Sequence, residues 1–174
     1  MFRVSCIQLC SSDNTEHNLK RTKQLIIKAV KQKSDFILTP EVSSKISLDK
    51  KKLLQSTTTM EKASYLNGIK YLAKKYKKWI LIGSLIIKKS RNKLVNRSIL
   101  ISPKGKINCY YDKIHMYDVS LSKKESYLES SIFESGKKYK ICRLPWGKLG
   151  MSVCYDLRFP NLYRSLAKKG SLFL

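Results

Sequence analysis

Apolar and polar positions follow two different periods along this chain, which predicts both helices and strands. Residues 15–33 place Leu19, Ile26 and Val30 at helical spacing, and residues 59–76 repeat apolar side chains in the same way. Short apolar runs predict β-strands at residues 2–9, 36–39, 79–87, 95–101, 107–111, 139–144 and 149–153. Helices and strands therefore share one chain, with strands predominating after residue 79.

The last part of the chain, residues 160–174, is expected to form one more helix and the start of one more strand. Pro160 suits the first turn of a helix that runs to residue 169, and Gly170 ends it. Residues 171–174 are apolar and begin another strand, which would leave a sheet edge and a hydrophobic face uncovered. Residues 114–138 have little periodicity, so we expect a loop there with room for a helical turn.

The order of these elements predicts an α/β fold, with helices over a largely β core. A length of 174 residues and a hydrophobic content of 43% suit one domain with a substantial core. The longest apolar run has nine residues, whereas a membrane-spanning helix needs about 20, and no signal peptide is evident. We therefore expect a cytoplasmic protein without a membrane partner. Its five cysteines are expected to be reduced thiols, with Cys109 and Cys142 in the core.

The net charge is large and positive, because 36 Lys and Arg face 12 Asp and Glu, a difference of +24. Lysine supplies 29 of the 36 cations in scattered doublets and runs, and no nucleic-acid-binding module accompanies them. Weak binding to polyanions at low salt follows from such a charge. The scarcity of Ala, Pro and Gly beside abundant Ile and Lys also fits the coding bias of an AT-rich genome. We expect no specific nucleic-acid partner.

Three residues suit nucleophilic catalysis, although each has a structural alternative. Cys154 lies between an apolar strand and a helix, where the helix N-terminus favours a thiolate; a lone cysteine is more often buried and inert. Glu41 follows a buried strand that Pro40 ends, and could take a thiol proton or cap the next element. Lys113 could stabilise a thiolate or an oxyanion, but composition does not distinguish it among 29 lysines.

Three motifs together resemble the nitrilase superfamily of carbon–nitrogen hydrolases. Thr39-Pro40-Glu41 is similar to the segment with the family's general base. Residues 111–118 (YDKIHMYD) are similar to its lysine segment, and residues 150–160 (GMSVCYDLRFP) to its nucleophile segment. The opening Ile7-Gln8 and Asn18-Leu19 also fit, and Glu129 matches a supporting glutamate. The resemblance extends from the first strand to the last residue, and it is most similar to the branch of omega-amidases and deaminated-glutathione amidases.

This resemblance implies a catalytic set of Glu41, Lys113 and Cys154, with Glu129 orienting either a water molecule or Glu41. It implies that Cys154 attacks an amide, that Lys113 and the Tyr155 backbone N–H hold the oxyanion, and that ammonia leaves a thioester for water to hydrolyse. Arg158 would either bind a substrate carboxylate or brace its loop. Cofactors and metals are not implied, and the substrate is a small amide.

The family's fold is a four-layer α-β-β-α sandwich, and complete members usually form oligomers. We expect residues 1–174 to be its N-terminal part, a carbon–nitrogen hydrolase domain incomplete at the C-terminus, from a truncated or split gene or a degraded reading frame. Two functions remain open: an amidase, active or relict, and a non-catalytic protein that binds through its scaffold or basic surface.

Overall fold

A computed structural model describes residues 2–122 and 125–174. Five strands form the main sheet in the order β1-β2-β3-β4-β5: β1 (Val4–Cys6), β2 (Phe36–Leu38), β3 (Trp79–Lys88), β4 (Leu94–Ile101) and β5 (Ile107–Asp112). The pairs β1–β2 and β2–β3 are parallel, while β3–β4 and β4–β5 are antiparallel. Two antiparallel hairpins follow: β6 (Asp118–Ser122) with β7 (Glu125–Leu128), and β8 (Ile141–Leu144) with β9 (Gly147–Gly150).

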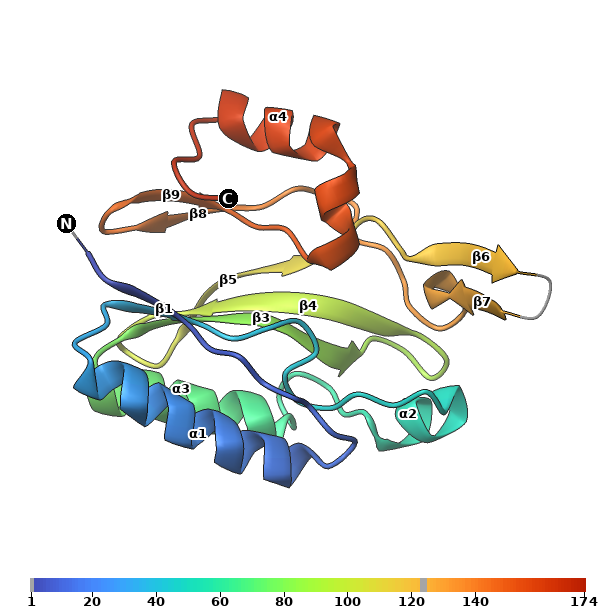
Figure 1. Ribbon diagram of the computed structural model, residues 1–174, viewed down its shortest axis with the longest axis horizontal. Coiled ribbons are helices and arrows are strands. Elements are labelled where there is room, and N and C mark those ends of the chain that lie inside the picture. Colours follow the sequence, from blue (N-terminus) through green and yellow to red (C-terminus); the bar gives the residue numbers. More distant parts are fainter. Residues whose placement is uncertain (1, 123–124) are drawn as a thin grey trace.

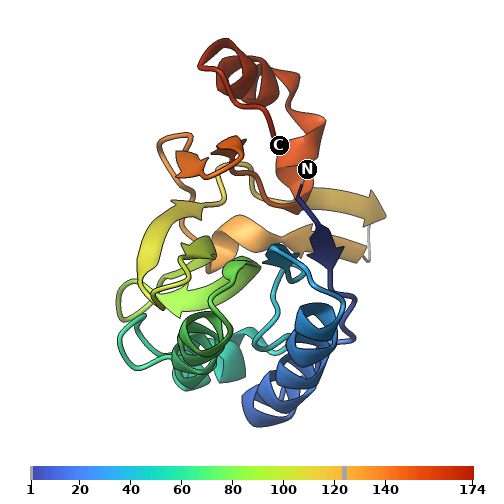
Figure 2. The same cartoon turned by 90° about the vertical axis from the view of Figure 1, so that its left-hand side faces the viewer.

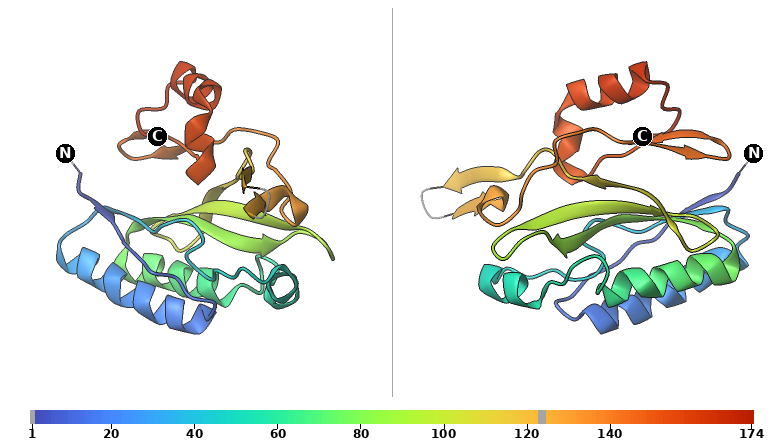
Figure 3. Two further views of the ribbon diagram at one scale, coloured as in Figure 1. Left: turned by 45° about the vertical axis from the view of Figure 1, so that its right-hand side comes forward. Right: turned by 180° about the vertical axis from the view of Figure 1, so that it is seen from behind.

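The helices complete a layered molecule (Figure 1). They are α1 (Thr15–Lys31), α2 (Lys50–Ser56), α3 (Ser64–Tyr76) and α4 (Pro160–Lys168), with short 3-10 helices η1 (Glu129–Ser131) and η2 (Cys154–Arg158). Helices α1 and α3 lie on one face of the main sheet, β8 and β9 lie over the other face, and α4 is outermost (Figures 2 and 3). This order of layers confirms the predicted α-β-β-α arrangement.

Helices α1 and α3 form because each has one apolar stripe and a defined end. The Asn14 side chain accepts the His17 N–H at 2.9 Å and caps α1. The stripes of both helices pack on the sheet in a core cluster that includes Ile26, Ile69 and Ile80. A hydrogen bond of 2.8 Å between the hydroxyls of Thr22 and Tyr65 links the two helices inside this layer.

The second core cluster lies between the main sheet and β8–β9. It contains Leu100, Tyr111, Leu149 and Met151, all at most 5% exposed. Cys109 of β5 and Cys142 of β8 form a disulfide across it, with their Cα atoms 6.4 Å apart. The expectation of reduced thiols was wrong for this pair, because packing of the two layers brings the cysteines within bonding range. Their place in the core is confirmed, with Cys109 half-buried and Cys142 buried.

Other boundaries differ from the sequence expectations in identifiable ways. The segment 114–138 contains the β6–β7 hairpin as well as the expected helical turn, η1. Helix α2 was not expected, and α3 begins at Ser64 rather than near residue 59. At the end of the chain, the expected strand is a single parallel bridge between Leu149 and Phe173. Local apolar periodicity is weak wherever an element is short and largely exposed.

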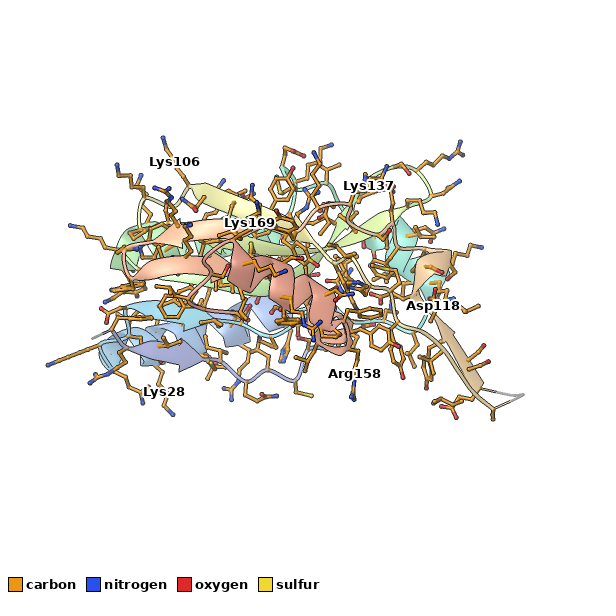
Figure 4. The ribbon with its side chains drawn as sticks, turned by 90° about the horizontal axis from the view of Figure 1, so that it is seen from above. Lys28, Lys106, Asp118, Lys137, Arg158 and Lys169 are labelled. Atoms are coloured by element: carbon orange, nitrogen blue, oxygen red, sulfur yellow. A yellow bond between two sulfur atoms is a disulfide. The ribbon has the colours of Figure 1, made fainter. Side chains whose placement is uncertain are left out.

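Lysine side chains are distributed around the molecule rather than gathered in one place. Figure 4 shows Lys28, Lys106, Lys137 and Lys169 at widely separated positions. No helix in residues 2–122 and 125–174 is long and apolar enough to cross a membrane.

Candidate active site

Glu41 is held where β2 ends, by a turn bound to the irregular middle of β3. The pairing of β3 with β4 shifts register between Ile82 and Leu85, and Gly83 lies in that interval. The Gly83 N–H donates to the Thr39 carbonyl at 3.1 Å, and a Cβ atom at Gly83 would overlap that same oxygen. The Ser84 hydroxyl oxygen accepts the Val42 N–H at 2.8 Å on the other side of Glu41. Close backbone approach therefore determines where the Glu41 carboxylate points.

Lys113 comes directly after β5 and is only 2% exposed. Its N–H donates to the Asn96 carbonyl at 2.9 Å, and its own carbonyl accepts the Gly136 N–H at 2.7 Å. Gly136 has no room for a Cβ atom, which would overlap the Asp112 carbonyl oxygen. The backbone of Lys113 is therefore hydrogen-bonded to β4 on one side and to the segment that leads to β8 on the other.

The Lys113 ammonium lies between two carboxylates. Its Nζ is 2.9 Å from Glu129 Oε2 and 3.3 Å from Glu41 Oε1. Asn96 also donates to Glu41 Oε1 at 2.8 Å, and the Tyr117 N–H donates to Glu129 Oε2 at 2.7 Å. At least two donors therefore orient each carboxylate. A fixed orientation of this kind suits a catalytic base, the role expected of Glu41.

Cys154 is the first residue of η2 and has a left-handed backbone, with φ of 48°. Such a conformation is uncommon for a residue with a side chain and is found at strained turns in functional sites. The Cys154 residue is exposed, whereas the flanking Val153 is buried. The strand–turn–helix placement expected from the sequence is present here as β9, a sharp turn and η2.

Asp156, fully buried, holds this turn in place. Its Oδ2 accepts the Val153 N–H at 2.9 Å and the Tyr111 hydroxyl at 2.7 Å. Its Oδ1 accepts the His115 N–H at 3.0 Å and lies 2.6 Å from His115 Nδ1. The His115 ring also stacks on Phe159, with centroids 3.6 Å apart. One carboxylate therefore connects the turn that contains Cys154 to β5 and to the segment after Lys113.

Glu41, Lys113, Glu129 and Cys154 line one cavity of about 480 Å³. Asn96, Tyr117 and Lys50 contribute further polar groups. The remaining wall is largely apolar and is formed by Val42, Ile46, Leu48, Leu53, Ile86, Tyr127, Leu128, Ile132 and Phe133. A small organic molecule with a polar head fits such a mostly apolar site with a few convergent polar groups.

The charges in this cavity shift the pKa values of two groups. Burial opposes the Lys113 charge, but Glu129 and Glu41 outweigh it and raise the pKa of Lys113. Burial and the neighbouring Glu41, to which the thiol hydrogen-bonds, raise the pKa of Cys154, and Lys113 acts in the opposite direction. A neutral thiol beside a carboxylate is an arrangement that suits proton transfer from the sulfur to Glu41.

Tyr155 and Arg158 belong to η2. Tyr155 is half-buried and follows Cys154, so its N–H lies at the start of the 3-10 helix, where such groups have no intrahelical acceptor. Arg158 is exposed, points away from the molecule in Figure 4, and is absent from the residues that line the cavity. No group of three or more His, Cys, Asp or Glu side chains suited to a metal occurs in the described residues.

Two residues of the site were not identified from the sequence. Asn96 is a polar residue within the buried strand β4, which is a signal for a site residue. Asp156 is a carboxylate two residues after the candidate nucleophile, and its burial becomes evident only when β5 and η2 meet. Asn96 lines the cavity and hydrogen-bonds to Glu41, whereas Asp156 lies outside the cavity lining and holds the turn that contains Cys154.

Known proteins resemble this chain over nearly its whole length. The sequence profile of the family described as carbon-nitrogen hydrolase matches residues 3–174. The chain belongs to the carbon–nitrogen hydrolase family. It is 34% identical over 183 residues to the deaminated glutathione amidase of Dictyostelium discoideum, covering 99% of this chain and 62% of that protein. It is 31% identical over 177 residues to an omega-amidase of Saccharomyces cerevisiae, covering 98% of this chain and 60% of that protein.

Solved structures of other family members have the same fold. The Caenorhabditis elegans NitFhit protein superimposes with a TM-score of 0.89 at 27% identity, covering 97% of this chain and 42% of that chain. An amidase from Nesterenkonia sp. superimposes with a TM-score of 0.82 at 18% identity, covering 98% and 64%. This carbon–nitrogen hydrolase chain therefore spans about 60% of the length of the curated relatives it matches.

Proposed function

We propose that this chain is an amidase that releases ammonia from a small carboxylic-acid amide through a thioester on Cys154. The observation that carries the proposal is the arrangement around Lys113, whose ammonium joins Glu41 and Glu129 in the cavity that Cys154 lines. A nucleophile, a base and a cation for the oxyanion are the parts that acyl transfer needs. Amidases among the relatives support the same reaction class.

In the first half of the reaction, Glu41 takes the thiol proton and the Cys154 sulfur attacks the amide carbonyl carbon. The carbonyl π electrons move to the oxygen, where the Lys113 ammonium and the Tyr155 N–H stabilise the negative charge. When the carbonyl re-forms, the carbon–nitrogen bond breaks and the proton held by Glu41 passes to the nitrogen. Ammonia leaves, and the acyl group remains on the sulfur.

In the second half, Glu41 is again a carboxylate and takes a proton from water, whose oxygen attacks the thioester. The carbon–sulfur bond breaks, the carboxylic acid leaves, and the proton on Glu41 returns to Cys154. Glu129 keeps Lys113 charged and in place through contacts of 2.9 and 3.2 Å. No metal or cofactor enters this scheme.

The test is ammonia release from a panel of small carboxylic-acid amides. We expect Cys154→Ala to abolish release, because the thioester cannot form, and Cys10→Ala to retain it, because Cys10 is an exposed cysteine outside the cavity. Iodoacetamide should label Cys154 in the wild-type chain, located by peptide mass analysis. A folded, monodisperse sample that releases no ammonia from any amide of the panel would contradict the proposal.

The alternative is a non-catalytic protein that binds polyanions through its basic surface. The net charge of +24 favours it, but the lysines are distributed over the surface (Figure 4). Binding of this kind weakens steeply with salt. Sequence-selective binding to a nucleic acid at physiological salt would support this alternative over the amidase.

A further inference from the structure

A disulfide joins the two β layers beside the elements that lead into the candidate active site. Cys109 belongs to β5 and Cys142 to β8, and Figure 1 shows β5 beneath the β8–β9 hairpin. Strand β5 leads directly to Lys113, and β9 leads to the turn that contains Cys154. The bond therefore ties together the supports of two residues of the proposed catalytic set.

The two sulfur atoms of this bond differ in their access to solvent. Cys142 is only 3% exposed and lies in the core between the layers. Cys109 is half-buried and lines a surface groove of about 620 Å³, to which every residue of the edge strand β5 contributes. We call it the β5 groove. A thiolate that enters this groove reaches Cys109 Sγ, with Cys142 as the leaving group.

The β5 groove carries an excess of positive charge. Three exposed lysines line it without an ion-pair partner among the described residues: Lys137, Lys138 and Lys140. Asp112 is the acidic residue among its described lining, and Arg97 pairs with it at 2.6 Å. Lys89, also in the lining, pairs with Glu134 at 2.7 Å. A concave surface with unbalanced charge of one sign concentrates solutes of the opposite sign.

Hydrogen bonds connect the disulfide to the turn that contains Cys154. Tyr111 lies two residues after Cys109 and donates its hydroxyl to Asp156 at 2.7 Å. The same carboxylate accepts the N–H of Val153, the residue before Cys154, at 2.9 Å. Loss of the disulfide removes a covalent restraint on the spacing of the two layers that this carboxylate bridges, so the turn gains freedom to open locally.

We propose that the Cys109–Cys142 disulfide is a redox-sensitive site that anionic thiols open through the β5 groove, and that its opening loosens the turn that contains Cys154. The attacking thiolate forms a bond to Cys109 Sγ while the bond to Cys142 Sγ breaks, and Cys142 leaves as a thiolate that takes a proton from water. A second thiolate then attacks the small molecule's own sulfur, which releases Cys109 and a small-molecule disulfide. The simpler alternative is a purely structural bond that no class of thiol opens preferentially.

The first test compares two thiols with the same carbon skeleton, 2-mercaptoethanesulfonate and 2-mercaptoethanol. Loss of the disulfide-linked peptides is followed by mass analysis, and each rate is divided by the thiolate concentration. At about 0.01 M salt we expect the sulfonate to open the bond about tenfold faster, because the lysines attract its additional negative charge. At about 1 M salt the ratio should fall toward one, since salt screens this attraction.

Two variants locate the preference on the β5 groove. A groove variant combines Lys137→Gln, Lys138→Gln and Lys140→Gln. A control variant combines substitutions at exposed positions of α1, on the other side of the main sheet from β8–β9: Lys20→Gln, Lys28→Gln and Lys31→Gln. The groove variant should lose most of the preference for the sulfonate, and the control should keep it. Equal rates for the two thiols in the wild-type chain at low salt, or a preference that survives in the groove variant, would overturn the proposal.

The second test measures hydrogen exchange and does not depend on amidase activity. Deuterium uptake in β8–β9 and η2 should rise several-fold when the bond is open, whereas uptake in α1 should stay constant. The Cys109→Ser and Cys142→Ser double variant supplies the open form, and Cys6→Ser, at an exposed position, is the control. The reduced wild-type chain gives the same comparison if the double variant does not fold. Equal uptake in η2 with the bond open and closed would show that the bond does not hold the turn, which contradicts the proposal.

Discussion

At the scale of single residues, the Lys113 ammonium determines whether two carboxylates can share one cavity. Glu41 and Glu129 would repel each other without the cation that contacts both. Burial and Glu41 both favour the neutral form of Cys154, and together they raise the pKa of the thiol. The proposed base and the proposed nucleophile are therefore coupled, and removing the charge of Glu41 should change the ionisation of Cys154.

The pH dependence of Cys154 alkylation follows from this coupling. The rate should rise with pH around a midpoint above the ordinary cysteine value, because burial and Glu41 raise the thiol pKa and the thiolate is the reactive form. In Glu41→Gln the midpoint should move to lower pH, since a negative charge is removed. Ammonia release should nevertheless fall by roughly 10²- to 10⁴-fold, because the base is lost.

The measurement is the rate of iodoacetamide labelling of Cys154 between about pH 6 and pH 11, a range that brackets the ordinary cysteine value. Glu16→Gln, which alters an exposed carboxylate in the first turn of α1, is the control and should leave the midpoint unchanged. A midpoint that stays constant or rises in Glu41→Gln would contradict the coupling.

At the scale of elements, the site depends on three turns that separate parts of the chain hold together. Gly83 allows the turn after β2 to approach β3, and Gly136 allows a later segment to approach the end of β5. Asp156 joins η2 to Tyr111 and His115. Each turn positions one side chain of the proposed catalytic set, so damage to a turn should reduce the proposed activity even where no cavity residue changes.

Asp156→Asn tests this dependence. All backbone and hydroxyl partners of the carboxylate are donors, so an amide nitrogen at either position would face donors it cannot pair with. We expect a loss of about 2 to 3 kcal/mol in the free energy of unfolding, measured by urea denaturation. We also expect slower Cys154 alkylation in the fraction that remains folded.

The control for this variant is Asp13→Asn, since Asp13 is an exposed carboxylate paired with Lys52 and should contribute little. Equal stability of Asp156→Asn and the wild-type chain would show that the buried carboxylate does not hold the turn.

At the scale of the whole molecule, the disulfide between Cys109 and Cys142 joins the main sheet to the β8–β9 layer. The two cysteines are separated by 33 residues in the sequence, and the closed loop includes the β6–β7 hairpin and Glu129. Closing a loop of this length restricts the unfolded chain. The bond therefore stabilises the arrangement in which the two β layers face each other.

Thiol titration of the chain unfolded without reductant should find three free thiols, on Cys6, Cys10 and Cys154. Reduction, or the Cys109→Ser and Cys142→Ser double variant, should lower the free energy of unfolding by about 3 to 4 kcal/mol. Cys6→Ser, at an exposed position, should have little effect. Five titratable thiols before reduction would contradict the bond.

Much of the fold was predictable from the local pattern of apolar and polar residues alone. The apolar stripes of α1 and α3 and the long buried strands β3 and β4 are periodic over many residues, so their positions agree with the expectations. The β6–β7 hairpin was missed, because almost all of its described residues are exposed and no alternation of buried and exposed positions marks it. Helix α2 was missed because it is the shortest α-helix in the described residues, with a single buried residue, Leu53.

The sequence by itself determined the candidate catalytic set, since the three motifs and Glu129 could be identified without any coordinates. It could not determine the contacts that make this set a site, because Glu41 and Lys113 are 72 positions apart and meet only through sheet packing. The disulfide, the buried Asp156 and the place of Lys50 on the cavity also depend on long-range packing. Residue types and local motifs indicate which chemistry a chain could perform. The distances between its side chains, their burial and the electric field around them arise only when distant segments pack together.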